Sequence, residues 1–154
     1  MSIFSEIIDQ WVIAETAFSD IESRAFANDD EPLFDNASEM RKRNDQAYFL
    51  YLFTRFEAAV NEAVVIVRGN RTLPSIPWPE RRMWETMNNR EIKNVAFLTR
   101  VEILMDKSSS DYATVKSYYD GRNKVAHGGV WDEQFVIPSI ASTMETLMHG
   151  FPTT

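Results

Sequence analysis

Apolar residues recur three and four positions apart along nearly the whole chain, which is the spacing typical of amphipathic α-helices. The pattern is longest over residues 37–68, where it includes Tyr48, Leu52, Phe53, Phe56, Val60, Ala63, Val64 and Val67. No window alternates apolar and polar residues over a length that would favour a strand. The pattern therefore predicts an all-α fold: one domain over 1–154, built as a bundle of about five helices.

Capping residues and prolines predict the bounds of the first two helices. The first helix is expected over 2–27 and is followed by an acidic, proline-containing loop over 28–35. Asn36 with Glu39 resembles a capping box, in which each side chain bonds the other's backbone N–H. We therefore expect the long second helix to run from about residue 37 to residue 68.

Three prolines between residues 72 and 79 exclude a helix there, because proline lacks the N–H that a helix interior requires. A short helix is expected to begin at Pro79, where proline suits the first helical position. Further helices are predicted over about 90–106, over about 110–128, and from Pro138 onward.

The net charge of −7 is unevenly distributed along the chain. Residues 1–39 carry ten acidic side chains and a single basic one, Arg24, whereas residues 40–154 carry 13 acidic and 15 basic side chains. The acidity is therefore local, and a basic surface is permitted elsewhere on the molecule.

The chain has no cysteine and only two histidines, His127 and His149. Disulfides, thiolate zinc sites and cysteine nucleophiles are excluded, and two imidazoles cannot form a multi-histidine metal site in one chain. We expect no metal and no cofactor. No apolar stretch approaches about 20 residues and the first residues lack the basic segment of a signal peptide, so we expect a cytoplasmic protein without a membrane partner.

Arg122 lies in the middle of the apolar stripe of the helix predicted over 110–128, beside Val115 on a helical wheel. Arginine is rarely buried without a partner, because an unpaired buried charge strongly destabilises the fold. We therefore expect a carboxylate, backbone carbonyls or an anionic ligand beside it, and Glu57 is the candidate carboxylate. Gly121 costs about 1 kcal/mol relative to alanine in a helix interior, which indicates close approach of another helix or of a ligand.

His127 is predicted in the last turn of the same helix, directly before Gly128 and Gly129, because glycine commonly ends helices. There the helix dipole favours a protonated imidazole by about 0.3–1 kcal/mol. An imidazole near neutrality can both accept and donate a proton. The alternative is a histidine that only bonds exposed carbonyls at the helix end. We interpret His149, which also precedes a glycine, in this second way.

Residues 122–127, RNKVAH, resemble the signature of the HEPN superfamily (higher eukaryotes and prokaryotes nucleotide-binding domains). That signature is an arginine, usually a polar residue such as asparagine next, and a histidine after four to six intervening residues; four intervene here. The following Gly128-Gly129 and a long second helix bearing Phe56-Glu57 are similar too. The resemblance therefore extends over nearly the whole chain and implies a HEPN-like helical fold.

The resemblance also implies a homodimer in which two copies of the motif face each other across one cleft. Many HEPN domains are metal-independent endoribonucleases that act as toxins, antiphage effectors or RNA-processing enzymes. Arg122 and His127 would then match the catalytic arginine and histidine, and Asn123 the polar residue that orients them. RNA supplies its own nucleophile, the 2′-OH, so such an enzyme needs only a base, an acid and positive charge at the phosphate. The expected residues beyond the motif are Glu57 in a supporting role, and Lys124, Arg81 and Arg82 as contacts to RNA. The basic run Arg41, Lys42 and Arg43 is a further candidate for guiding RNA, and its alternative is a solvated helix face.

Two alternatives stay open beside the nuclease. One is a HEPN-like module without activity that binds a nucleotide in the same cleft. The other is an interaction protein in which Arg122 pairs with Glu57 and the acidic first helix binds a partner. Some HEPN toxins carry a tyrosine two residues after the histidine, which a partner antitoxin modifies; Gly129 stands there in this chain. That form of control is therefore in doubt, although a neutralising antitoxin or regulatory protein remains an expected partner.

Overall fold

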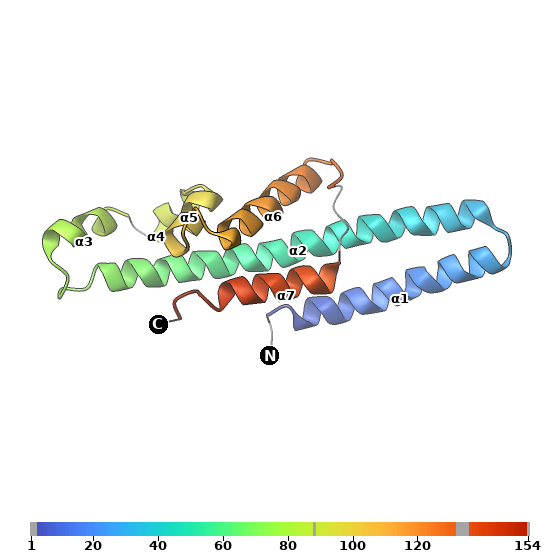
Figure 1. Ribbon diagram of the computed structural model, residues 1–154, viewed down its shortest axis with the longest axis horizontal. Helices are drawn as coiled ribbons and strands as arrows, with labels where there is room; N and C mark the ends of the chain where they lie inside the picture. The colour runs from blue at the N-terminus through green and yellow to red at the C-terminus, as the bar shows by residue number, and fades with distance from the viewer. Residues whose placement is uncertain (1–2, 88, 132–135, 154) are drawn as a thin grey trace. The chain divides into compact units, whose positions relative to one another are not determined.

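The computed structural model describes residues 3–87, 89–131 and 136–153. These ranges contain helices and no strand, so the all-α prediction is confirmed. In the described part of the chain the helices are α1 (Ser5–Ala27), α2 (Glu31–Arg71), α3 (Trp78–Glu85), α4 (Asn89–Asn94), α5 (Phe97–Leu104), α6 (Ser110–Ala126) and α7 (Ile137–Met148) (Figure 1). There are thus more helices than the five expected, and several are short.

The loop predicted over 28–35 is wrong, because α2 already begins at Glu31. Pro32 lies in the first turn of α2, where a missing N–H removes no intrahelical hydrogen bond. Asp30 precedes the helix, and its Oδ1 accepts a hydrogen bond from the backbone N–H of Leu33 at 3.1 Å. An aspartate in this position satisfies a free donor of the first turn, so the proline starts the helix and does not interrupt it.

Two further predictions about helix bounds need correction. Asn36 does not cap the long helix but lies inside it, and α2 ends at Arg71 and not near residue 68. The helix predicted over 90–106 is two helices, α4 and α5, because Ala96 has φ −53° and ψ 140°. The motif helix, α6, ends at Ala126, two residues before its predicted end. The expected start of the first helix at Ser2 lies outside the described residues.

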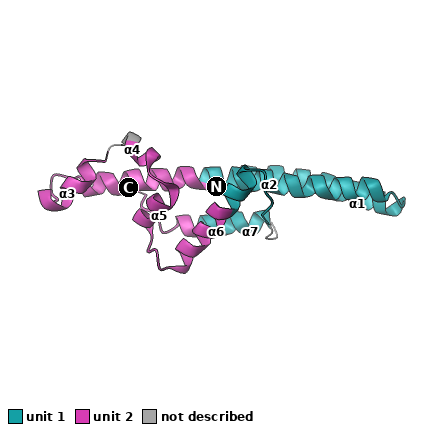
Figure 2. Cartoon of the chain, turned by 90° about the horizontal axis from the view of Figure 1, so that it is seen from above, with its two compact units in different colours: residues 1–55, 121–145 teal, residues 56–120, 146–154 magenta. Residues whose placement is uncertain are grey.

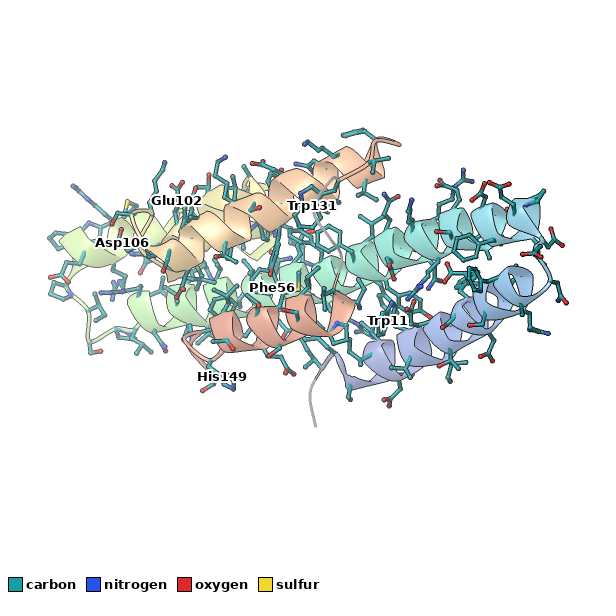
Figure 3. The ribbon with its side chains drawn as sticks, turned by 45° about the vertical axis from the view of Figure 1, so that its right-hand side comes forward. Trp11, Phe56, Glu102, Asp106, Trp131 and His149 are labelled. Carbon is teal, nitrogen blue, oxygen red and sulfur yellow. The ribbon has the colours of Figure 1, made fainter. Side chains whose placement is uncertain are left out.

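The chain forms two compact units, which Figure 2 colours separately: unit 1 is residues 1–55 with 121–145, and unit 2 is residues 56–120 with 146–154. In unit 1, α1 lies against the N-terminal half of α2, and polar side chains join the two helices. Trp11 Nε1 donates to Asp45 Oδ1 at 2.8 Å (Figure 3), and Arg41 bonds Glu15 and Glu22. The buried residues of this unit include Ile7, Ala25, Phe49, Leu52, Phe53, Trp131, Ile137 and Met144.

Unit 2 has its own core of large apolar side chains. Phe56, which Figure 3 labels, is fully buried. Its ring centroid lies 6.1 Å from that of Phe151. Phe97 stacks on Tyr119 with a centroid distance of 5.1 Å. The other buried residues include Val60, Val64, Ile92, Val101 and Val115. The prediction of one domain over 1–154 stays a prediction. In the described ranges, none of the helices is both long and apolar enough to cross a bilayer.

Candidate functional site

The C-terminal end of α6 is closed by its two glycines. Gly128 has φ +80°, a left-handed conformation that glycine adopts without strain. Its N–H donates to the carbonyl of Val125 at 3.0 Å, and the N–H of Gly129 donates to the carbonyl of Lys124 at 2.9 Å. This pair of bonds is the Schellman motif, in which the residue before the left-handed glycine caps the helix. That residue is His127, so the capping geometry fixes the backbone of the candidate histidine.

The segment after the glycines is anchored by Trp131 (Figure 3), which is 8 % exposed. Its ring covers Gly121 so closely that a Cβ there would lie 2.5 Å from the ring atoms. The same ring lies 4.8 Å from that of Phe49 of α2, centroid to centroid. The glycine inside α6 is therefore explained by the approach of an aromatic side chain, and not by a second helix or a ligand. This contact ties the loop over 128–131 to both α6 and α2.

Arg122 and Asn123 are joined directly. Arg122 is half-buried, and its Nη1 donates to Asn123 Oδ1 at 3.0 Å. Within unit 1, Arg122 forms no ion pair with a described residue. Its charge is thus oriented by a neutral amide and is not neutralised by a carboxylate, which leaves it available to an anion. This burial differs from the expectation that Arg122 lies in the middle of the buried stripe. In this turn of α6 the buried residue is Gly121, and Arg122 is only partly buried.

His127 is exposed, and its imidazole makes no hydrogen bond with a described residue. The next two residues, Gly128 and Gly129, line a groove of about 470 Å³ in unit 1. Lys42 and Arg43 of α2 line it as well. The described residues that line it are Glu39, Lys42, Arg43, Gln46, Val125, Gly128, Gly129 and Val130. His127 is therefore followed in the sequence by two residues that line the groove, and the groove also carries the cationic side chains of Lys42 and Arg43.

Glu57 is bound by a different arginine from the one expected. It belongs to unit 2, where Arg100 Nη2 donates to Glu57 Oε1 at 2.8 Å, and Arg100 Nη1 bonds Asn61 Oδ1. Arg100 is 5 % exposed, and its guanidinium lies 5.6 Å from the ring centroid of Phe97. Glu57 thus pairs with an arginine, as the sequence led us to consider, but the arginine is the buried Arg100, and Glu57 itself is only partly buried.

The three basic residues expected to contact RNA lie in different units. Lys124 is exposed in unit 1, on the motif helix. Arg81 and Arg82 belong to α3 in unit 2, where Arg81 pairs with Glu85 and lies over the ring of Trp78 at 5.8 Å from its centroid. Arg82 is exposed. Arg81 and Arg82 therefore do not join the motif within one compact unit.

Ion pairs hold α1 against α2 and are formed by Arg41 of α2 with Glu15 and Glu22 of α1. The same helix, α2, bears Lys42 and Arg43, which line the groove. The hydrogen bond to Glu15 raises the pKa of Arg41, and Glu22 adds to the effect. Burial raises the pKa of the Asp45 carboxyl, although the hydrogen bond from Trp11 lowers it in part. Arg41 is therefore paired with two glutamates of α1, whereas its neighbours Lys42 and Arg43 line the groove.

The sequence predicts neither Arg100 nor the groove itself, although Lys42 and Arg43, which line the groove, are among its candidates for guiding RNA. Arg100 falls three residues after Phe97 and one before Val101, both of which are buried, so its place on an apolar stripe is visible once the start of α5 is known. The groove depends on contacts between segments about 80 residues apart, for which the sequence gives no local signal.

Among the described residues, no three acidic or imidazole side chains converge as metal ligands do. Comparison with known protein families, with curated proteins and with solved structures finds no match. The interpretation of the site therefore depends on its own residues and on the resemblance of residues 122–127 to the HEPN signature.

Proposed function

We propose that the chain is a metal-independent endoribonuclease of the toxin or antiphage-defence type, acting as a homodimer. The observation that carries the proposal is the state of Arg122. It is half-buried, oriented by Asn123 and not paired with any carboxylate among the described residues of its unit. An arginine in this state retains a planar fork of donors that matches two oxygens of a phosphate.

The chemistry would proceed by attack of the ribose 2′-OH on the adjacent phosphorus. A neutral imidazole removes the 2′-OH proton, the P–O5′ bond breaks, and a protonated imidazole supplies the proton for the departing 5′-oxygen. The products are a 2′,3′-cyclic phosphate and a 5′-hydroxyl. Arg122 would stabilise the negative charge that accumulates on the phosphate oxygens, and Asn123 would hold its guanidinium in place.

The proposed homodimer is supported by the spacing of the motif residues. Residues five apart on an α-helix are separated by about 7.5 Å along the axis and by about 140° around it. An ideal helix would therefore place Arg122 and His127 on different sides, and each chain supplies a single motif imidazole. A second copy facing the first would provide the second imidazole, so that one acts as the base and the other as the acid.

The decisive experiment is cleavage of single-stranded RNA by the purified protein in EDTA. His127→Ala should lower the rate by about 10²–10⁴, the usual contribution of a positioned acid–base group. Arg122→Ala should lower it by about 10²–10³, the usual cost of losing one group that stabilises charge in the transition state. His149→Ala is the matched control, because His149 is also exposed and also precedes a glycine at a helix end (Figure 3). It should retain full activity.

Two further readouts complete the test. The products of the wild-type protein should carry cyclic phosphate ends, and a substrate with 2′-deoxyribose at the cleaved position should resist cleavage. If wild type and His127→Ala give equal rates, the nuclease proposal is wrong. Nucleotide binding by a wild-type protein that does not cleave would instead support the inactive HEPN-like module.

A further inference from the structure

We propose that the groove formed by α2 and the end of α6 binds one nucleotide of single-stranded RNA beside the cleaved phosphate. The inference rests on the proposed function and extends it, since it assigns a substrate-binding role to residues outside the motif. The described residues that line the groove all belong to unit 1, and two of them, Gly128 and Gly129, directly follow His127. Its volume of about 470 Å³ is typical of sites for small ligands.

The two cations of the groove are available to a phosphate. Lys42 is exposed and forms no ion pair or hydrogen bond with a described residue. Among the described residues, Arg43 pairs with Glu39 alone, four residues earlier on the same helix, at 3.3 Å and with 75 % of the Arg43 side chain exposed. Such an exposed pair contributes about 0.3–0.5 kcal/mol, so a phosphate can readily take the place of Glu39. Their neighbour Arg41, by contrast, is held by Glu15 and Glu22.

The end of α6 does not repel an anion from the groove as strongly as an open helix end would. Bare carbonyls at a helix C-terminus carry partial negative charge. Here the carbonyls of Lys124 and Val125 accept hydrogen bonds from Gly129 and Gly128. The glycines also bring no side chain to the groove wall, so a ligand can approach the backbone closely.

The remaining lining residues suit a nucleobase. Val125 and Val130 offer an apolar surface for the flat face of a base, and Val130 is 65 % exposed. Gln46 and Glu39 add amide and carboxylate groups that can bond the edge of a base. A base reaches such a surface only when it is unstacked and unpaired, which is the usual mode of RNA recognition by proteins. The groove therefore favours single strands over duplexes.

The test is equilibrium binding by the His127→Ala protein, so that cleavage does not interfere. The probes are a fluorescent ten-nucleotide single-stranded RNA of mixed sequence and the same strand in a duplex, each over a range of salt concentrations. One lost phosphate contact reduces the slope of log K against log salt by about 0.7 and the affinity at 0.1 M salt by about fivefold. Lys42→Ala should show this reduction.

Lys107→Ala is the matched control, because Lys107 is also exposed and its loss changes the net charge equally. If Lys42→Ala and Lys107→Ala have the same affinity and salt slope, or if the duplex binds as tightly as the single strand, the groove proposal is overturned even when the wild type cleaves RNA. If the wild type does not cleave but Lys42→Ala still loses affinity and slope, the nuclease proposal fails and the groove stands as a site for single-stranded RNA. In a cleaving protein, Lys42→Ala should raise KM and leave kcat unchanged.

Discussion

Replacement of Gly121 by alanine tests the contact that anchors the candidate site. Alanine in a helix interior is more favourable than glycine by about 1 kcal/mol. At residue 121, however, the added Cβ would lie 2.5 Å from two ring atoms of Trp131 and 2.8 Å from a third. Real Cβ atoms do not approach so closely, so the indole ring must move. Such overpacking typically costs about 1–3 kcal/mol, and the net effect should be a loss of up to about 2 kcal/mol.

Gly69 provides the matched control, since it also lies inside a helix but a Cβ added there would have no neighbouring atom within 4 Å. Gly69→Ala should stabilise the protein by up to about 1 kcal/mol. The propensity gain is common to both variants, so the difference between them, about 1–3 kcal/mol, measures the clash. Urea unfolding followed by far-ultraviolet circular dichroism gives both free energies without relying on tryptophan fluorescence.

A double-mutant cycle then decides whether Trp131 is the cause. In a Trp131→Ala background the clash is gone, and Gly121→Ala should become neutral or stabilising. If Gly121→Ala destabilises the protein equally in both backgrounds, the ring of Trp131 does not pack on Gly121 as described. The position of the loop over 128–131, and with it the groove, would then have no structural basis.

Three other substitutions test separate parts of the structure. Glu57→Ala should lower the free energy of unfolding in urea by about 3 kcal/mol, because it leaves the buried Arg100 without its carboxylate; a loss below about 1 kcal/mol would show that the pair is not formed. Asp45→Asn should raise the melting temperature at pH 7, and this gain should shrink towards pH 4. Burial raises the folded-state pKa of Asp45, so the wild-type protein loses stability as pH rises through that pKa. A gain in melting temperature that does not depend on pH would contradict this. Gly128→Ala should cost about 1–2 kcal/mol in thermal unfolding because of its positive φ, whereas Gly150→Ala, where the nearest atom to a Cβ is an ordinary 3.7 Å away, should have little effect.

The fold was predictable where local chemistry decides it. The apolar period of α2 and the glycine pair after α6 act within a few residues, so the sequence predicts both. Pro32 was misinterpreted because a proline is compatible with both a loop and a first helical turn. What decides between them is Asp30, whose side chain caps the helix at that point.

The break between α4 and α5 explains why Arg100 was overlooked. Residues 94–96, Asn-Val-Ala, contain no proline or glycine, so nothing in the sequence marks the extended conformation at Ala96. In a continuous helix over 90–106, the buried positions would follow one helical repeat from end to end. The break resets that repeat, and the buried positions of α5 become Phe97, Arg100 and Val101. A single unmarked residue thus changes which arginine lies inside.

The distribution of carboxylates between the two arginines bears directly on function. A guanidinium with 5 % exposure must be paired, because its desolvation is otherwise uncompensated, and Arg100 takes Glu57 and Asn61 for this purpose. Arg122 is only half-buried and can remain hydrated in part, so the amide of Asn123 suffices to orient it. Arg100 therefore has a carboxylate partner, whereas Arg122 has none among the described residues of its unit. Under the proposed function, an anionic substrate would pair with this half-buried charge on α6, and the exposed imidazole of His127 lies directly after the same helix.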